Sequence, residues 1–479
     1  MADTNAKISQ TGASRAVDRA FNDLLIICDN PNDGAEIPNG SIISLTIHED
    51  IFSLLPVVIL TIIDSGTKFD AAKSNESYYI GKKLYIQYRP KIKLDKGDKT
   101  PPAYVQTRVV IQEISHLHND KMPAHVYKLS CCFDAMSILT RVLPYPAKDE
   151  QMPELQVALA EGSASVIQSI LGAGGLACTK EANTFDSMHW VNTRMRICQF
   201  LNKVLDHSWI EQGDALMVFT SMFGERDNEG KSENFDALAH CTSCSELMNQ
   251  TSEIRFVSES DKVREGKSSV IQYQRLSIVE AGGVSTIPNG YTHQTTTFNT
   301  DNLHTYDPFT FLDVTEFEPI DTSFLGSDML HSANLNVVRT TYDGIPNKQF
   351  ASNPGTVESL YEFVAGRHDG GIHFMDSHEH YDVAPAHNKS VIASYFTTKI
   401  ELLVNMSELD KDIVMNPNFL PRVGQKVTLD CSSDEKHANL GYSGDYIIGS
   451  VEISIMNDRQ RPGAAEAIIT LIGSGNYQS

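Results

Sequence analysis

A histidine-rich segment in the last third of the chain could bind a metal ion. Its members are His368, His373, His378, His380 and His387, with Asp376 and Glu379 between them. If the run His378-Glu379-His380 is a strand, both imidazoles lie on one face, as some metal sites require. Solvated histidines are nevertheless the simpler interpretation in a glycine-rich segment. We therefore expect no metal ion, and His378, His380 and His373 are the candidate ligands should one bind.

Cys241-Thr242-Ser243-Cys244 is a Cys-x-x-Cys motif without the context that such motifs need. A structural zinc site needs a second pair of ligands at suitable spacing, and His240 is the sole obvious neighbour. A redox motif needs a thioredoxin-like βαβ unit, which the surrounding pattern does not provide. The sequence therefore favours thiols without a ligand.

The glycines of Gly172-Ala173-Gly174-Gly175 fit a loose dinucleotide fingerprint but follow an expected helix. A true fingerprint follows a strand and opens a helix, so these glycines are expected to end the helix before them. The chain also lacks a Gly-x-Ser-x-Gly elbow and a P-loop. Among its many carboxylates, no pair can be assigned to glycoside hydrolysis. The sequence thus predicts no catalytic residues and no cofactor.

The elements around these motifs begin with a β-rich region. Residues 1–20 are polar and small, and we expect a flexible arm there. Residues 21–145 are expected to form a first β-domain, with strands at Leu24–Cys28, Ser41–Ile47 and Val57–Ile63. The last of these strands is apolar at successive positions, which predicts a strand buried on both faces.

Residues 146–310 are expected to form a mixed α/β middle domain. Helices are predicted at Pro153–Ala160, Ala164–Leu171 and Asn192–Leu205, the last with Asn192 or Thr193 as its cap. A strand at Ala215–Phe219 follows. The middle domain therefore contrasts with the β-rich region before it.

Residues 311–479 are expected to form a second β-domain with an inserted segment at about 345–395. Strands are predicted at Leu335–Thr340 and Lys399–Val404. One helical turn is expected near Val357–Val364, within the histidine- and glycine-rich insertion.

Both ends of the chain carry the same strand pattern. Each copy has a strand opened by Gly-x-Lys, then a polar loop, an apolar run that ends in Asn-Asp, and a closing strand. The corresponding runs are Gly81–Ile86 and Gly424–Leu429, Arg108–Asp120 and Tyr446–Asp458, and Val126–Leu129 and Ile468–Leu471. This pattern predicts a duplicated β-domain, and such pseudo-symmetric chains commonly build rings or adaptors.

Composition limits the classes of partner. The formal net charge is −22, which argues against a nucleic-acid-binding surface. Eight cysteines in 479 residues do not make a disulfide framework. The first residues lack the pattern of a signal peptide, and the apolar run Leu54–Ile63 is too short to span a bilayer. We therefore expect synthesis in a cytoplasm and no membrane anchor.

The runs Phe21–Tyr88 and Gly424–Gly473 resemble the tail hub proteins of tailed bacteriophages. That family is related to the hub part of type VI secretion spike proteins. The run Pro421–Leu429 followed by Ser443–Ile448 is similar to that of many hubs. So is the Trp190–Leu205 segment followed by Trp209 and the Leu216–Phe219 strand. The histidine-rich insertion has no counterpart in the family pattern.

This resemblance implies a β-dominated α+β fold, with two tail-tube-like barrel or sandwich domains around the middle domain. It implies a structural, non-enzymatic baseplate hub in the virion tail, made in the host cytoplasm. The implied partners are two further copies in a homotrimer, the tail tube protein, the central spike protein and other baseplate proteins. Three chains would present six similar domains to a sixfold tube, and DNA would pass the acidic lumen without specific binding.

Two alternatives to this hub stay open at the level of sequence. One is a hub-associated peptidoglycan hydrolase whose site lies in the middle domain. The other is a spike-like protein of a type VI secretion system, or a peripheral tail protein. No repetitive β-helical spike follows the second β-domain, which counts against a fused spike.

Overall fold

The structure is a computed structural model of the chain. The described residues are 23–29, 37, 39–64, 80–90, 104–117, 125–133, 157–180, 182–192, 195–211, 213–221, 238–258, 269–281, 292–299, 313–314, 359–366, 378, 381, 384–396, 398–406, 409–416, 419–431, 442–457 and 462–473. The expected arm at 1–20 and the expected strand at Leu335–Thr340 lie outside these residues.

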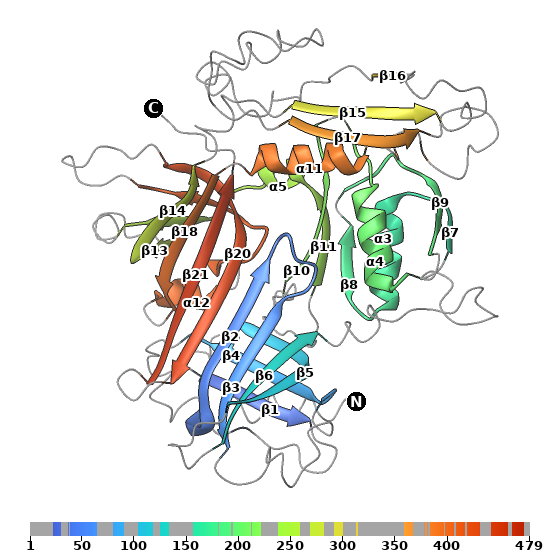
Figure 1. The fold of residues 1–479 in the computed structure, drawn as a ribbon. Coiled ribbons are helices and arrows are strands. Elements are labelled where there is room, and N and C mark those ends of the chain that lie inside the picture. Colours follow the sequence, from blue (N-terminus) through green and yellow to red (C-terminus); the bar gives the residue numbers. More distant parts are fainter. Residues whose placement is uncertain are drawn as a thin grey trace.

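The first six strands form the N-terminal β-unit, drawn in blue to teal in Figure 1. They are β1 (Asp23–Asp29), β2 (Ile42–Asp50), β3 (Val57–Asp64), β4 (Lys83–Arg89), β5 (Val105–Leu117) and β6 (His125–Phe133), with the short 3-10 helix η1 (Asn39–Ser41) before β2. Their order across the sheet is β1-β4-β5-β6-β3-β2, and neighbouring strands are antiparallel.

A second set of strands forms the C-terminal β-unit. They are β12 (Ile254–Val257), β14 (Arg275–Ala281), β18 (Thr398–Asn405), β19 (Lys426–Leu429), β20 (Gly444–Asn457) and β21 (Pro462–Gly473). β13 (Val270–Gln272) lies beside β12, and the short helix α12 (Lys411–Met415) precedes β19. The pairings give the order β12-β19-β20-β21-β18-β14.

The two β-units have the same strand order, both along the chain and across the sheet. Strand for strand, β1, β2, β3, β4, β5 and β6 correspond to β12, β14, β18, β19, β20 and β21. The pairings differ in direction at one point, because β1 is antiparallel to β4 whereas β12 is parallel to β19. We propose that the C-terminal β-unit begins at β12, which lies before residue 311.

The correspondence extends to individual hydrogen bonds. The N–H of Gly81 donates to the carbonyl of Ile111 at 2.7 Å, and the N–H of Gly424 donates to that of Ile448 at 2.8 Å. Both glycines have positive φ, at 85° and 80°. Each receiving strand then has a bulge directly after its isoleucine.

Rows of paired residues run across each unit from these isoleucines to the outermost strand. The row in the N-terminal β-unit is Ile111, Cys131, Val58 and Ile47, and its counterpart in the C-terminal β-unit is Ile448, Leu471, Ile400 and Ile278. Seven of these eight side chains are at most 3% exposed, whereas Ile278 is 38% exposed.

The described residues in the middle of the chain form two small sheets and three helices, one of them short. Its elements are β7 (Val157–Glu161), α3 (Ser163–Ala173), β8 (Ala177–Lys180), β9 (Met188–Val191), α4 (Ile197–Asp206), β10 (Leu216–Ser221), β11 (Leu238–Ser243) and the short helix α5 (Cys244–Asn249). The first sheet has the order β10-β11-β8, and β7 pairs with β9 in the second. α3 packs against β8 and α4, so the helices cover this sheet (Figure 1).

Three predictions for the middle and the insertion are wrong. Residues 157–160 of the expected helix Pro153–Ala160 belong to the strand β7, which pairs with β9. Trp190 of β9 donates from Nε1 to the carbonyl of Glu161 at the end of β7. α4 begins at Ile197, several residues after the expected caps. The expected turn near Val357–Val364 is the strand β17, whose β-branched and aromatic residues favour an extended backbone.

β17 (Ser359–Gly366) is parallel to β15 (Thr292–Asn299), and β16 (Asp313–Val314) pairs with β15. Beneath this three-stranded sheet lies α11 (Ala384–Tyr395), which Figure 1 shows between it and the rest of the molecule.

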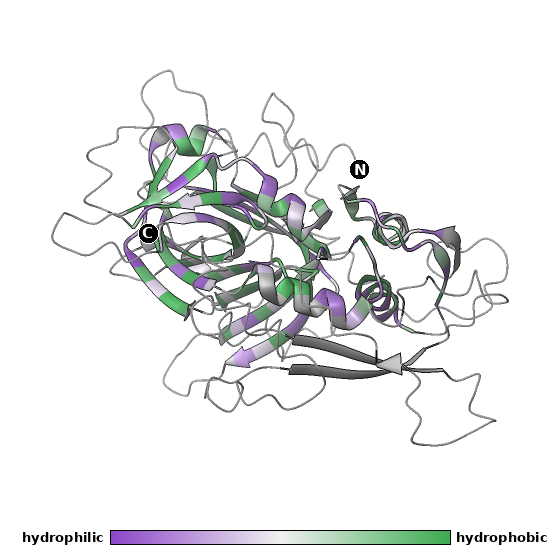
Figure 2. Ribbon diagram, turned by 90° about the horizontal axis from the view of Figure 1, so that it is seen from above, coloured by the Kyte–Doolittle hydropathy of each residue, from purple (hydrophilic) through white to green (hydrophobic). Residues whose placement is uncertain are grey.

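The structure confirms the β-dominated α+β fold. Within the described part of the chain, thirteen strands join one sheet that includes both β-units. Hydrophobic and hydrophilic residues alternate along many of its strands (Figure 2), as expected for strands with one face toward a core. None of the described helices is long and apolar enough to cross a membrane.

Candidate assembly interface

The two β-units meet along a strand pair within the chain, which we call the internal junction. β2 pairs with β20 in antiparallel register, from Ser44 opposite Met456 to Asp50 opposite Ser450. β20 is long enough for two partners on that edge, because its first residues, 444–447, pair with β19. β21 occupies its other edge. The first half of β20 thus completes its own unit, and the second half binds the other unit.

Polar contacts fix the register of the internal junction. The N–H of Ile51 donates to the carbonyl of Gly449 at 2.8 Å, just past the end of the paired stretch. Three residues from this bond along the ladder, His48 Nδ1 lies 3.6 Å from Glu452 Oε2. Because hydrogen-bonded and non-hydrogen-bonded pairs alternate in antiparallel sheets, Thr46 and Ser454 form a non-hydrogen-bonded pair.

A buried tyrosine links the two units a second time. Tyr104 is 1% exposed, and its hydroxyl donates to the carbonyl of Pro421 at 2.7 Å. Burial, followed by the nearby negative charge of Glu49, raises the pKa of Tyr104 well above its usual value. The phenol therefore stays protonated and remains a donor.

The middle domain contacts both units through one strand. The ring of Phe219 in β10 lies against Gly424, where a Cβ atom would come within 2.3 Å of the phenylalanine Cζ. The neighbouring Thr220 donates its hydroxyl to the carbonyl of Leu54, between β2 and β3. β10 thus fixes the middle domain to both sides of the internal junction.

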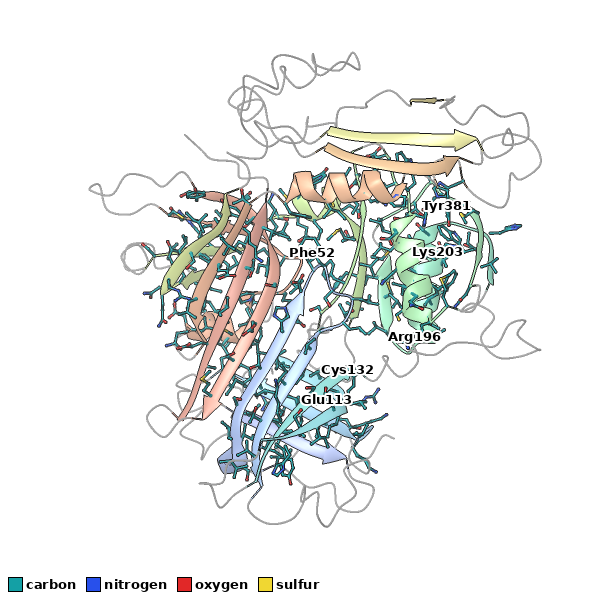
Figure 3. The ribbon with its side chains drawn as sticks, in the orientation of Figure 1. Phe52, Glu113, Cys132, Arg196, Lys203 and Tyr381 are labelled. Atoms are coloured by element: carbon teal, nitrogen blue, oxygen red, sulfur yellow. The ribbon has the colours of Figure 1, made fainter. Side chains whose placement is uncertain are left out.

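Exposed aromatic surface adjoins the internal junction. Phe52, labelled in Figure 3, follows β2 and is 57% exposed. Its ring meets Phe396, at the end of α11, edge to face with 6.0 Å between centroids. The part of the insertion that includes α11 therefore touches the same region.

The described histidines of the histidine-rich segment make structural contacts to the middle domain. His378 is 9% exposed and its Nε2 lies 2.8 Å from the carbonyl of His207. The ring of His207 stacks on Tyr381 with centroids 3.9 Å apart, and its Nδ1 lies 2.7 Å from the Tyr381 carbonyl. Tyr381 and Lys203 of α4 are labelled in this region of Figure 3.

α11 is held to the end of α4 in a similar way. Gly213 donates its N–H to His387 Nε2 at 3.1 Å, and His387 packs on Trp209. Asn388 donates from Nδ2 to the carbonyls of Asp206 at 3.2 Å and Ser208 at 2.9 Å. These bonds satisfy carbonyls at the C-terminus of α4, where the helix provides no partner.

Of the candidate metal ligands, only His378 falls within the described residues, whereas His373 and His380 do not. In the described ranges no group of three or more histidine, cysteine, aspartate or glutamate residues is placed to hold a metal ion. Among the described residues, His378 thus has a carbonyl partner and no second candidate ligand beside it.

The other two motifs have structural roles. Gly174 is the C-cap of α3 and Gly175 has φ of 81°, while the N–H of Leu176 donates to the carbonyl of Leu171, which confirms the helix-ending interpretation. Cys241 and Cys244 are buried, and Ser243 between them caps α5. Burial, followed by the charge of Asp214, raises the pKa of Cys244 well above its usual value.

Sequence reasoning missed the contacts that hold the units together. Tyr104 and Pro421 are 317 positions apart, and nothing in either local pattern indicates that they meet. The same is true of Asn388 and α4. The repeat itself could have indicated a junction, since two copies of a sheet with open edges can pair with each other.

Known proteins resemble this chain in structure rather than in sequence. No protein-family model matches the sequence, and no curated protein matches it. The chain is similar to the 43 kDa tail protein of prophage MuSo2 from Shewanella oneidensis, with 9% identity and a TM-score of 0.47 over 96% of this chain and 98% of that chain. It is also similar to the tail protein from Neisseria meningitidis MC58, with 9% identity and a TM-score of 0.46 over 95% of this chain and 98% of that chain.

A third similar structure is a chain of the half-lidded PdpA–VgrG complex of Francisella, with 9% identity and a TM-score of 0.45. That similarity covers 98% of this chain and 61% of that chain. The solved structures that this chain resembles thus include two tail proteins and a chain of a PdpA–VgrG complex.

Proposed function

We propose that this protein is the structural hub of a phage tail baseplate. In this role, three chains form a ring of six β-units, which adapts the sixfold tail tube to a threefold central spike. The hub acts by binding other proteins and performs no catalytic step. The two non-identical units present similar surfaces to the tube and different surfaces to the spike.

The single observation that carries this proposal is the duplication of the β-unit. Two units with the same strand order, and with the same glycine-to-isoleucine hydrogen bond, lie side by side in one chain. A chain of this kind can meet a sixfold partner with three copies, because each copy supplies two near-equivalent surfaces.

The charge of the chain fits a channel for DNA. A net charge of −22 repels phosphate, so DNA inside such a ring would move without being held. The proposed lumen therefore conducts DNA and does not bind it specifically.

The proposal is tested by assembling tail tubes from the same phage in the presence of this protein. The tube protein is allowed to polymerise with and without gold-labelled hub chain, and the tubes are viewed by negative-stain microscopy. We expect label at one end of the tubes and faster nucleation. Label along the tube walls, or no label and no change in nucleation, would contradict a hub and favour a peripheral tail protein.

A further inference from the structure

Each half of the internal junction has a counterpart elsewhere in the molecule whose corresponding edge is open, in that no described strand pairs with it. β2 corresponds to β14, and β20 corresponds to β5. β14 pairs with β18 on one edge, and no described strand pairs with its other edge. The first half of β5 pairs with β4, but past the bulge at Gln112 no described strand lies on that side.

Equivalent side chains are buried in the paired strands and more exposed in the strands with an open edge. Ile47 in β2 is 1% exposed, whereas the equivalent Ile278 in β14 is 38% exposed, and the next residue, Val279, is 46% exposed. Val451 in β20 is 1% exposed, and its equivalent in β5, Ile114, is only partly buried. Exposed aliphatic residues on an open edge strand are a template for pairing with another chain.

The two open edges lie at opposite ends of the paired units. In Figure 1, β14 lies at the outer left of the C-terminal β-unit, and β5 lies on the right of the N-terminal β-unit. Glu113, labelled in Figure 3, marks the open part of β5. Two complementary surfaces on opposite ends of one molecule produce head-to-tail assembly, which closes into a ring when the rotation permits.

We propose that β14 of one chain pairs with the second half of β5 of a second copy, in the same antiparallel register that joins β2 to β20 within the chain. The occupant of both open edges is therefore another copy of this protein. The inference rests on the proposed ring and specifies which strands close it.

The internal junction fixes the register of this contact between chains. Ile47 lies opposite Ile453, which corresponds to His116 in β5, so Ile278 is expected opposite His116 of the other copy. Thr46 lies opposite Ser454, so the equivalent Ser277 is expected opposite Leu117. The second pair occupies a non-hydrogen-bonded position, where Cα atoms are about 4.5 Å apart and a disulfide can form.

The test is disulfide formation in the double variant Ser277→Cys/Leu117→Cys. The purified full chain is oxidised and run on a denaturing gel without reductant. We expect covalent species of two and three chains, which reductant returns to one. Each single variant reports the background from native cysteines, whose described members are buried or half-buried.

Two matched pairs control for geometry. Thr46→Cys/Ser454→Cys is the equivalent pair at the internal junction and should form a disulfide within one chain. Ser277→Cys/Ser115→Cys is displaced by two residues, where the diagonal distance is roughly 7–8 Å, and should give much less product. Equal yields from the displaced pair and the Ser277–Leu117 pair would overturn the proposed register.

A second variant tests the contact without cysteine chemistry. Ile278→Lys places a charge on the open edge and should shift the assembly toward one chain in light scattering. Phe185→Lys changes a residue of the middle domain that is 74% exposed and belongs to neither β14 nor β5, so it should leave the mass unchanged.

The outcomes separate this inference from the proposed function. A trimer by mass that gives no Ser277–Leu117 disulfide overturns the inference and leaves the ring standing. The disulfide together with a mass other than three chains supports the strand pairing and overturns the threefold ring. Absence of both overturns both.

Discussion

Two equivalent glycines differ only in what surrounds them. Gly81 and Gly424 share positive φ and the same hydrogen bond, but a Cβ atom at Gly81 would meet nothing within 4 Å. At Gly424 it would collide with Phe219 of the middle domain. Substituting each glycine by alanine therefore separates the energetic cost of a left-handed backbone from the cost of a clash with β10.

We predict that Gly81→Ala lowers the free energy of unfolding by about 1–2 kcal/mol, the cost of a left-handed backbone. Gly424→Ala should lower it by about 1–3 kcal/mol more, because the methyl group overpacks the contact with Phe219. Urea unfolding of both variants measures the difference. Phe219→Leu should recover part of it in a double-mutant cycle, and equal losses for the two glycines would contradict the packing argument.

The thiol of Cys431 gives a pH dependence at the residue scale. Burial, followed by the charge of Asp430, raises the pKa of Cys431 from 9.0 to about 11. Below pH 9 the thiol is protonated in both the folded and the unfolded state. As pH rises from 9.0 toward 11, the unfolded chain loses this proton first, so stability falls with rising pH.

This effect is measured by comparing urea unfolding of the wild type and Cys431→Ala from pH 8 to roughly pH 11. We expect a steeper fall of the unfolding free energy in the wild type above pH 9. Parallel curves would show that burial of Cys431 does not perturb its titration.

At the scale of elements, α11 depends on one buried amide. Asn388 is 6% exposed and donates to two carbonyls at the end of α4. Asn388→Ala leaves both carbonyls without this donor, and we expect a loss of about 1–3 kcal/mol and faster hydrogen exchange across Ala384–Tyr395.

Gln168 supplies the matched control for this prediction. Its exposed side chain donates to the carbonyl of Cys178 at 3.1 Å. Because water can replace that donor, Gln168→Ala should cost less than about 0.5 kcal/mol. Unchanged exchange of α11 in Asn388→Ala would show that other contacts hold the helix.

The strands of the repeat could be predicted from sequence because their signals are local. The Gly-x-Lys openings, the apolar runs and the turn formers lie within short windows, and the structure places β4, β5 and β6, and β19, β20 and β21, at those runs. The prediction that β3 is buried on both faces is wrong. Its residues are apolar at successive positions, but Val57 is 46% exposed. Burial on the second face depends on neighbours that a strand pattern does not contain.

The pairing of the two units, in contrast, could not be derived from one sequence. The register of β2 on β20 joins residues about 400 positions apart and rests on backbone hydrogen bonds, which every residue type except proline can make. The contacts of His378 and Asn388 could not be predicted from sequence either. Both side chains contact backbone carbonyls near the end of α4, and only the fold reveals where those carbonyls lie.

For the whole molecule, net charge sets the behaviour toward DNA. With a formal charge of −22, the protein should not retard duplex DNA in a gel, even at about 50 mM salt, where phosphate contacts are strongest. A basic DNA-binding protein of similar mass serves as the positive control. Retardation that disappears as salt is raised would reveal a basic surface and contradict a channel that lets DNA slide.

The central claim is that two β-units per chain build a ring from three chains. Its most direct test is the absolute mass of the purified protein, measured by light scattering during size exclusion over a series of concentrations. The ring predicts a species of three chains of 53.0 kDa each that does not grow further with concentration. A species of one or two chains throughout the series, unchanged when the spike protein is added, would contradict it.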